Sequence, residues 1–426
     1  MRVFLVGSGG REHALAWKLG QSPLCEKIVA APGNPGIAGE AKVTCIPVGA
    51  DATSELVAAA VAERADLVVC GPEVPLAAGL GDTMRAAGLS FFGPSRAAAE
   101  IEGSKAYAKR LMRDAGVPTA AFGVFEDVAT ADAFIDAHPG AVVVKADGLA
   151  AGKGVVVTST KQEAKAAVRT MLAERTFGAA GARVVIEERL TGREVTMMAL
   201  CDGTRLALLA SSEDHKAVGD GDVGPNTGGM GTVSPSALVD DALAQRMLET
   251  LFVPTVRALT DAGRPFRGLL YGGFMLTPDR GPMVIEWNCR FGDPETQSVL
   301  MHFDGDLLPW LAGVAAGAMP SGTPRARTGV ALCVVLAAAG YPAAPRAGDA
   351  IAGLPPSSDD LVVFHAGTRQ DGDGPLLTAG GRVLGVTAYG ADLAAARARA
   401  YGAIEGIRFD GKHFRRDIGL RGSPRT

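Results

Sequence analysis

The sequence predicts a protein of mixed α/β and α+β class, with an N-terminal doubly wound parallel-sheet domain and a C-terminal strand-rich domain. Two observations predict this. Short apolar runs alternate with helix-like stretches through roughly the first hundred residues, whereas strand-like runs dominate from Gly329 onward. A chain of 426 residues with 47% hydrophobic content can form several cores. We expect domains at 1–103, 104–325 and 326–426, the second with a small lobe at about 120–192.

The expected elements follow one another in a simple order. The first domain has strands at 3–6, 28–31, 67–70 and 89–92. A helix at 104–115 opens the second domain, and Val117-Pro118-Thr119 ends it. Strands are then expected at 142–145, 154–157, 184–187 and 195–200, with a helix at 161–172.

The second half of the chain begins with a polar, glycine-rich segment at 213–231, where we expect one long functional loop. A helix at 241–262 and strands at 269–276 and 283–287 follow it. Residues 321–326 are expected to be a linker to the last domain.

Composition narrows the classes of function. The net charge of -4 gives no bulk positive field for nucleic acid or anionic membrane. The chain opens directly on a strand-like run, and no apolar segment approaches the length of a membrane span. The six cysteines lack metal-site spacing, which favours reduced thiols. We expect a cytoplasmic, monomeric protein with small-molecule partners, no nucleic acid and no membrane.

The most informative segment runs from Val284 to Glu295. Glu286, Asn288 and Arg290 alternate along it, which places them on one face of a strand. A carboxylate, an amide oxygen and a guanidinium suit a hard cation and the phosphate groups that accompany it. The alternative is an edge strand whose polar face is only solvated.

The segment 145–155 contains a glycine-rich turn, with an apolar run on each side of it. Lys145 precedes it and Lys153 lies within it, so backbone N–H groups and ammonium groups could contact phosphates. It is not a Walker A loop, because Gly154 and valines follow where Ser or Thr and a helix are required. An ordinary glycine-rich hairpin is the alternative.

Two further segments carry polar groups in unusual density. Asp214-His215-Lys216 precedes a glycine cluster at 224–231, where backbone could approach a ligand closely while Asn226 and Thr227 supply directed contacts. The strand ending at Glu187 and Glu188 could pair its exposed backbone with an adenine, and Glu194 could bind ribose hydroxyls. This is weaker evidence for a ligand site, because acidic strand ends are usually solvated.

The N-terminal segment Gly7-Ser8-Gly9-Gly10-Arg11-Glu12-His13 links a strand to a helix and could place a phosphate at the helix N-terminus. An NAD-binding Rossmann domain is the rival, but the second strand ends without the expected acidic residue. Gly71-Pro72-Glu73 follows the strand at 67–70 and should face the same crevice, at the carboxyl ends of the parallel strands. For Glu12 and Glu73, helix capping or a surface role is an equal alternative.

Taken in order, these segments resemble the ATP-grasp superfamily and, within it, the phosphoribosylamine-glycine ligase family. The resemblance covers essentially the whole chain. Its motifs are Gly9-Gly10-Arg11-Glu12-His13-Ala14, Gly71-Pro72-Glu73, 145–154, Asp214-His215-Lys216, 224–231 and 288–295. It implies an ATP-grasp fold, with ATP between two α+β lobes and an N-terminal domain that helps to hold a sugar phosphate.

The resemblance also implies a reaction. Glycine is joined to 5-phosphoribosylamine through glycyl phosphate, and ATP gives ADP and phosphate, in purine (IMP) biosynthesis. It implies Mg²⁺ or Mn²⁺ held by Glu286 and Asn288, and catalytic roles for Arg290, Asp214 and Lys216. The implied ATP-binding residues are Lys105, Lys145, Gly148, Gly152, Lys153, Gly154, Glu187, Glu188, Leu190 and Glu194. The implied substrate-binding residues are Gly9, Gly10, Arg11, Glu12, Glu73, Asn226, Thr227, Gly228, Gly229 and Asp293.

Two departures and two rivals stay open. Trp287 stands where the family more often has Phe, and Tyr271-Gly272-Gly273-Phe274 offers no carboxylate for a further metal ligand, which leaves the metal count open. A different ATP-grasp carboxylate-amine ligase should lack Asp214-His215-Lys216 and Gly228-Gly229-Met230-Gly231. A non-catalytic nucleotide-binding module would bind ATP without turnover.

Overall fold

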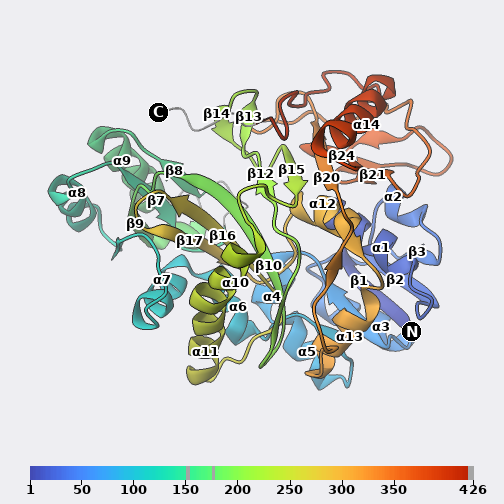
Figure 1. Cartoon of the computed structure of the whole chain (residues 1–426), viewed down its shortest axis with the longest axis horizontal. Coiled ribbons are helices and arrows are strands. Elements are labelled where there is room, and N and C mark those ends of the chain that lie inside the picture. The colour runs from blue at the N-terminus through green and yellow to red at the C-terminus, as the bar shows by residue number, and fades with distance from the viewer. Residues whose placement is uncertain (150–153, 175–177, 421–426) are drawn as a thin grey trace.

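The computed structural model describes residues 1–149, 154–174 and 178–420. Figure 1 shows a central antiparallel sheet with the N-terminal domain at the lower right, a small lobe at the left and the C-terminal domain at the upper right. Among the described residues, no helix is both long and apolar enough to cross a membrane.

The N-terminal domain is a parallel sheet in the order β3-β2-β1-β4-β5. Its strands are β1 (Arg2–Gly7), β2 (Lys27–Pro32), β3 (Val43–Cys45), β4 (Leu67–Cys70) and β5 (Phe91–Phe92). Its helices are α1 (Gly10–Gly20), α2 (Pro35–Ala38), α3 (Thr53–Ala62), α4 (Glu73–Ala78) and α5 (Leu80–Ala86). Val3 and Leu5 pack with α1, whereas Phe4 and Val6 pack with α3 to α5, so helices cover both faces. The doubly wound prediction is confirmed.

The small lobe is an antiparallel sheet in the order β6-β9-β7-β8. Its strands are β6 (Phe122–Phe125), β7 (Val142–Ala146), β8 (Val155–Val157) and β9 (Val184–Glu188), preceded by α6 (Arg96–Gly103) and α7 (Lys105–Asp114). Its helices are α8 (Val128–Ala137), α9 (Lys161–Val168), a π-helical turn Arg169–Ala173 and a 3₁₀ turn Gly178–Ala182. Val144 and Ile186 pack beneath α8 and α9. Their neighbours Lys145 and Glu187 therefore lie on the opposite face.

The central sheet has the order β11-β10-β16-β17. Its strands are β10 (Arg193–Asp202), β11 (Leu206–Leu208), β16 (Arg267–Thr277) and β17 (Gly281–Asn288). Its neighbours are α10 (Asp241–Met247), a π-helical turn Leu248–Phe252, α11 (Val253–Asp261), α12 (Glu295–His302) and α13 (Leu308–Ala316). Trp287 packs against Phe252 and Phe274 with ring centroids 5.0 and 5.6 Å away, which anchors β17 in the core.

The C-terminal domain is an antiparallel sheet in the order β12-β15-β20-β24-β21, with α14 (Leu393–Gly406) packed on it. Its strands are β12 (Glu213–Asp214), β15 (Gly231–Ser234), β20 (Val330–Ala337), β21 (Leu361–His365) and β24 (Arg382–Gly390). Short pairs are β18 (Phe303–Asp304) with β19 (Arg325–Ala326), and β22 (Thr368–Arg369) with β23 (Leu377–Thr378).

One expectation is wrong. The segment 213–231 is not a single loop, because it contains β12, the start of β15 and a hairpin of β13 (Ala217–Gly219) and β14 (Val223–Asn226). β15 pairs with β20, about a hundred residues further along the chain, so its backbone hydrogen bonds depend on a partner that local sequence does not show. The expected linker likewise ends in a strand, β19.

Candidate active site

Glu286 lies near the end of β17, where strand alternation buries its neighbour Trp287 and leaves Glu286 partly exposed. Burial alone would raise the pKa of Glu286, but surrounding cations outweigh it and hold that pKa below its usual range. In order of effect, these cations are Lys216, Lys145, Lys105 and Arg290. They come from four different segments, so the fold concentrates positive charge around one carboxylate.

Arg290 follows β17 and is held by an acidic pair. Its Nη2 lies 3.0 Å from Glu102 Oε1, and its Nε lies 3.4 Å from Glu73 Oε2. Its Nη2 also donates to Asn288 Oδ1 at 3.2 Å. Burial opposes the charge, but Glu102 and Glu73 outweigh it and raise the pKa of Arg290. The sequence reasoning missed Glu102, which lies on α6 and also accepts from Cys289 N at 2.7 Å.

Lys109 of α7 and Lys145 of β7 share one carboxylate. Glu187 Oε1 lies 2.9 Å from Lys145 Nζ, and Glu187 Oε2 lies 2.9 Å from Lys109 Nζ. All three side chains are at most 5% exposed. Burial lowers the pKa of Lys109 to about 8, although Glu187 opposes that change. Sequence reasoning missed Lys109, whose one signal is its position one helical turn after Lys105.

Lys105 and the two ends of the glycine-rich turn are close together. Lys105 Nζ donates to Gly148 O at 3.0 Å, and Gly154 O accepts from Ala146 N at 2.8 Å. Burial lowers the pKa of Lys105. Gly152 and Lys153, predicted to contact ATP phosphates, lie outside the described residues.

The end of the small-lobe sheet holds the residues expected near adenine and ribose. Glu188 N donates to Ala121 O at 2.9 Å, and its carboxylate pairs with Arg280 at 2.8 Å. Leu190 lies two residues beyond the end of β9 and is partly exposed. The carboxylate of Glu188 is thus engaged with Arg280, which leaves its carbonyl and the segment at Leu190 as candidate adenine contacts.

Lys216, which follows β12, and Glu194 of β10 form an ion pair of 3.1 Å. Glu194 raises the pKa of Lys216 well above its usual value, although burial opposes the change. Asp214 is buried, and Gly229 (φ 109°) lies against it: a Cβ at Gly229 would meet Asp214 Oδ1 at 2.7 Å. The glycine cluster therefore allows close packing beside this carboxylate.

The segment after β14 is folded back on itself. Thr227 Oγ1 donates to Lys216 O at 2.8 Å and accepts from Gly229 N at 3.0 Å. Gly228 N donates to Tyr341 OH at 3.1 Å, whereas Asn226 is exposed. Thr227 thus ties this segment to Lys216, and Asn226 is left facing solvent.

The N-terminal motif meets the end of β4. Gly9 N donates to Glu12 Oε2 at 2.6 Å, and Arg11 Nε donates to Glu12 Oε1 at 2.6 Å. A Cβ at Gly71 would stand 1.8 Å from Glu12 Oε1, so only glycine leaves room for this carboxylate. Gly10 is similarly close to Gln297, because a Cβ at Gly10 would stand 2.5 Å from Gln297 Nε2.

Asp293 joins the three domains. Gln297 Nε2 donates to Asp293 Oδ1 at 2.9 Å, and Arg382 of β24 donates from Nη1 to Asp293 O at 2.7 Å. Arg382 Nη2 lies 3.6 Å from Asp293 Oδ2, and Nη1 also donates to Gly228 O. Burial alone would raise the pKa of Asp293, but Arg382 and Arg11 lower it. Arg382 has no motif around it, and the sequence reasoning missed it.

The donor set suits a hard divalent cation. Glu286 is held ionised by its neighbours, and Asn288 offers an amide oxygen. No cluster of three or more His, Cys, Asp or Glu with metal-ligand geometry occurs among the described residues. Mg²⁺ is commonly bound by one or two protein oxygens together with substrate phosphates, so Glu286 and Asn288 fit that pattern.

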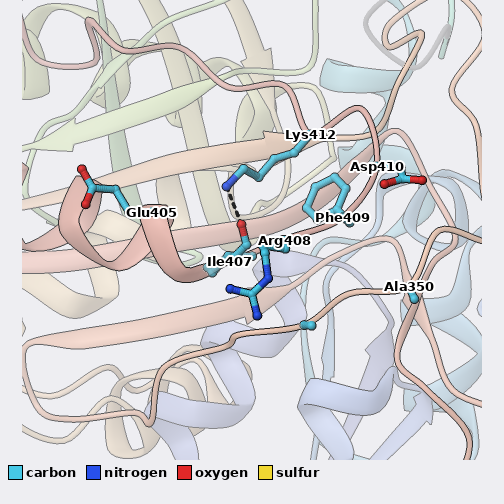
Figure 2. A pocket seen from close by; sticks show the side chains of 8 residues that line it. Ala350, Glu405, Ile407, Arg408, Phe409, Asp410 and Lys412 are labelled. Atoms are coloured by element: carbon cyan, nitrogen blue, oxygen red, sulfur yellow. Dashed lines mark hydrogen bonds between the residues drawn. The ribbon is translucent and has the colours of Figure 1, made fainter.

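The C-terminal domain has a surface pocket that is separate from this site. The pocket is shallow, with a volume of about 310 Å³, and Glu405, Arg408, Lys412 and neighbouring residues line it (Figure 2). Lys412 Nζ donates to Ile404 O at 2.8 Å and to Ile407 O, so its ammonium group satisfies carbonyls at the end of α14. None of the predicted site residues lines this pocket.

Comparisons with known proteins agree with the predicted family. Family models for phosphoribosylglycinamide synthetase match in order: the N domain at 1–102, the ATP-grasp (A) domain at 103–296 and the C domain at 331–421. A phosphoribosylamine-glycine ligase of Caulobacter vibrioides is 51% identical over 423 residues, covering 99% of this chain and 98% of the relative. Another, of Escherichia coli O6:H1, is 46% identical over 422 residues, covering 99% and 98%.

Solved structures give the same result. The phosphoribosylamine-glycine ligase of Thermotoga maritima superposes with a TM-score of 0.86 at 34% identity, covering 98% of this chain and 100% of that chain. A biotin carboxylase of Campylobacter jejuni superposes with a TM-score of 0.77 at 17% identity, covering 98% and 94%, which shows a shared fold.

The small-lobe sheet reaches the strand that carries Glu286 through Lys145, and the match to the ATP-grasp domain model makes this chain an ATP-grasp ligase. The chain belongs to the phosphoribosylamine-glycine ligase family, and it is an enzyme that ligates glycine to phosphoribosylamine in purine biosynthesis with the help of ATP. The ATP-grasp fold and the family prediction are confirmed.

Proposed function

We propose that ATP lies between the small-lobe sheet and the central sheet, with its phosphates directed at the cations around Glu286. The convergence of Lys216, Lys145, Lys105 and Arg290 on that carboxylate supports this proposal most strongly. Lysine ammonium groups are point charges suited to phosphate oxygens, and their attraction to phosphate is stronger where a site excludes water. Adenine then reaches the segment at Glu188 and Leu190, and its ribose reaches Glu194.

Glu286 and Asn288 are the residues that would hold Mg²⁺ or Mn²⁺. A bound divalent cation would neutralise charge on the phosphates during transfer. A biotin carboxylase domain of Hydrogenobacter thermophilus, which shares this fold, has been solved in complex with ADP and the magnesium salt of ADP. That comparison and the oxygen donors on β17 support a metal-nucleotide site here, and Asn288, fixed by Arg290, presents its amide oxygen in a defined direction.

The first chemical step is phosphoryl transfer. A carboxylate oxygen of glycine attacks the γ-phosphorus of ATP, the bond to the bridging oxygen of ADP breaks, and glycyl phosphate forms. This step depends mainly on positioning and charge stabilisation. Arg290 is suited to hold the acyl phosphate, because Glu102 and Asn288 fix its guanidinium plane.

The second step forms the amide bond. The amine of phosphoribosylamine attacks the carbonyl carbon of glycyl phosphate, the carbon–oxygen bond to phosphate breaks, and the nitrogen loses a proton. No protein nucleophile is required. Burial raises the pKa of the Cys201 thiol to about 11 and that of the Cys333 thiol to about 12, so these groups stay protonated at neutral pH.

The sugar phosphate is placed where the three domains meet. Arg11, Glu12 and Asp293 converge there from the N-terminal and central parts, and Arg382 arrives from the C-terminal domain. Carboxylates suit the ribose hydroxyls and the amine, and the arginines suit the phosphate.

Isotope transfer tests the proposed intermediate. The enzyme is incubated with Mg²⁺, ATP, phosphoribosylamine and glycine labelled with ¹⁸O in both carboxylate oxygens. Glycyl phosphate requires that one labelled oxygen appears in the released phosphate, detected by mass spectrometry. Unlabelled phosphate together with glycinamide ribonucleotide formation would rule out the acyl phosphate route.

A further inference from the structure

Lys109, Glu187 and Lys145 form a buried triad with two positive charges and one negative charge. The two lysines bind opposite oxygens of one carboxylate, each at 2.9 Å. Burying charge is costly, and breaking such an arrangement leaves an uncompensated ion. Apolar residues could fill this space without that cost. The cost of the triad is therefore consistent with a role in holding neighbouring groups in place.

Lys145 contacts the strand that carries Glu286 directly, and Lys109 is linked to that strand through Thr119. Lys109 Nζ donates to Thr119 Oγ1 at 2.7 Å, and Thr119 Oγ1 donates to Val284 O at 2.7 Å. Lys145 Nζ donates to Ile285 O at 3.1 Å. Thr119 and Lys145 therefore hold the two carbonyls that immediately precede Glu286.

These carbonyls belong to an irregular point in the central sheet. Gly273 pairs with Glu286, but the next residue, Phe274, pairs with Val284, so Ile285 is an extra residue in β17. Such β-bulges bend a strand and change the direction of the side chains next to them, and they occur often beside active sites. The side chain redirected here is that of Glu286, and the donor to the bulge carbonyl is Lys145.

We infer that Lys109 is a positioning residue for the metal-nucleotide site. By holding Glu187 and Thr119, it fixes Lys145 against Ile285 O and Thr119 against Val284 O, and so sets the bulge that aims Glu286. Lys109 faces Glu187 and Thr119 and acts through them. This role deepens the proposed function and rests on it, because the aim of Glu286 matters only if Glu286 holds a metal.

The test uses Lys109→Met, which keeps most of the side chain's length but removes its charge and hydrogen bonds. Binding of Mn²⁺ in the presence of a non-hydrolysable ATP analogue is measured from the free Mn²⁺ signal in electron paramagnetic resonance. Mutation of the residues that hold metal ligands in place typically lowers metal affinity or activity by about 10–100-fold. We expect Mn²⁺ affinity and kcat to fall at least roughly tenfold, with the KM values for glycine and phosphoribosylamine unchanged.

Two matched variants separate positioning from simple stability. Lys109→Arg keeps the charge and should restore most of the Mn²⁺ affinity. Lys18→Met removes another buried lysine, which donates to Phe303 O at 2.9 Å in the N-terminal domain, and should leave Mn²⁺ affinity unchanged. Wild-type Mn²⁺ affinity in folded Lys109→Met, or an equal loss in Lys18→Met, would overturn the inference.

A variant at Thr119 covers the case in which Lys109→Met does not fold. Thr119→Val keeps the shape of Thr119 and removes only its hydroxyl, so a weaker Mn²⁺ affinity is expected and an unchanged one overturns the inference. The outcome also separates the two proposals. A wild-type protein that binds no Mn²⁺ with the nucleotide analogue refutes the proposed metal site itself, whereas normal wild-type binding with unchanged variants refutes only the role of Lys109.

Discussion

Replacing Glu286 with Gln tests the charge balance at the centre of the site. The change keeps the size of the side chain but removes an anion that Lys216, Lys145, Lys105 and Arg290 all surround. Two unit charges about 4 Å apart interact by about 4 kcal/mol at an effective dielectric of about 20. A neutral side chain would bind a divalent cation less well and leave more net positive charge around it. We expect a loss of about 3–4 kcal/mol in transition-state stabilisation, or about 10²–10³-fold in kcat.

The assay is ADP formation under saturating substrates over a range of free Mg²⁺ concentrations. Asp202→Asn is the matched control, because Asp202 is a buried carboxylate at the far end of β10 that binds Arg205 and Met319 N. It should lower thermal stability but leave kcat per folded molecule unchanged. A Glu286→Gln enzyme with the kcat and Mg²⁺ dependence of the wild type would refute the assigned role of Glu286.

The same contacts give three further predictions. Arg290→Lys cannot bridge Glu102 and Asn288 with one planar group, so kcat should fall by about 10²-fold with little change in the KM for ATP, as steady-state kinetics will show. Arg382→Ala should raise the KM for phosphoribosylamine roughly tenfold and spare that for ATP, since it removes a charged donor beside Asp293; equal changes in both would count against this placement. Burial alone would raise the pKa of Asp202, but backbone N–H donors outweigh it and hold that pKa below its usual range, so its contribution to stability is present above the unfolded-state pKa and is lost as pH falls through the folded-state value. Acid unfolding curves should therefore show a smaller loss of stability at low pH for Asp202→Asn than for the wild type, and parallel curves would contradict this.

The sequence predicted the parts of the fold that local patterns encode. Four of the five N-terminal strands, together with the strands that carry Lys145 and Glu286, are continuous apolar runs or runs with period-2 alternation. β3 was missed because it is three residues long and only half buried. The β13–β14 hairpin was missed although Gly219-Asp220-Gly221-Asp222 contains an Asp-Gly turn signal. The pairing of β15 with β20 depends on distant sequence, which no local pattern shows.

The candidate site shows the same division. Glu286, Asn288 and Arg290 could be found because their chemistry alternates within one short strand. Glu102 and Arg382 could not, since each lies in a segment without a motif and reaches the site only through the packing of α6 or β24. Single charged residues of this kind are usually solvated, so only the tertiary structure shows which ones converge.

Phosphate release by the purified protein with Mg²⁺ and ATP tests the ligase reaction most directly. Glycine alone, freshly generated phosphoribosylamine alone, and both together are compared, and the product is identified by mass spectrometry. We expect rapid release that requires both substrates and yields glycinamide ribonucleotide. ATP binding without release under any of the three conditions, or release that does not depend on glycine, would contradict the proposed reaction.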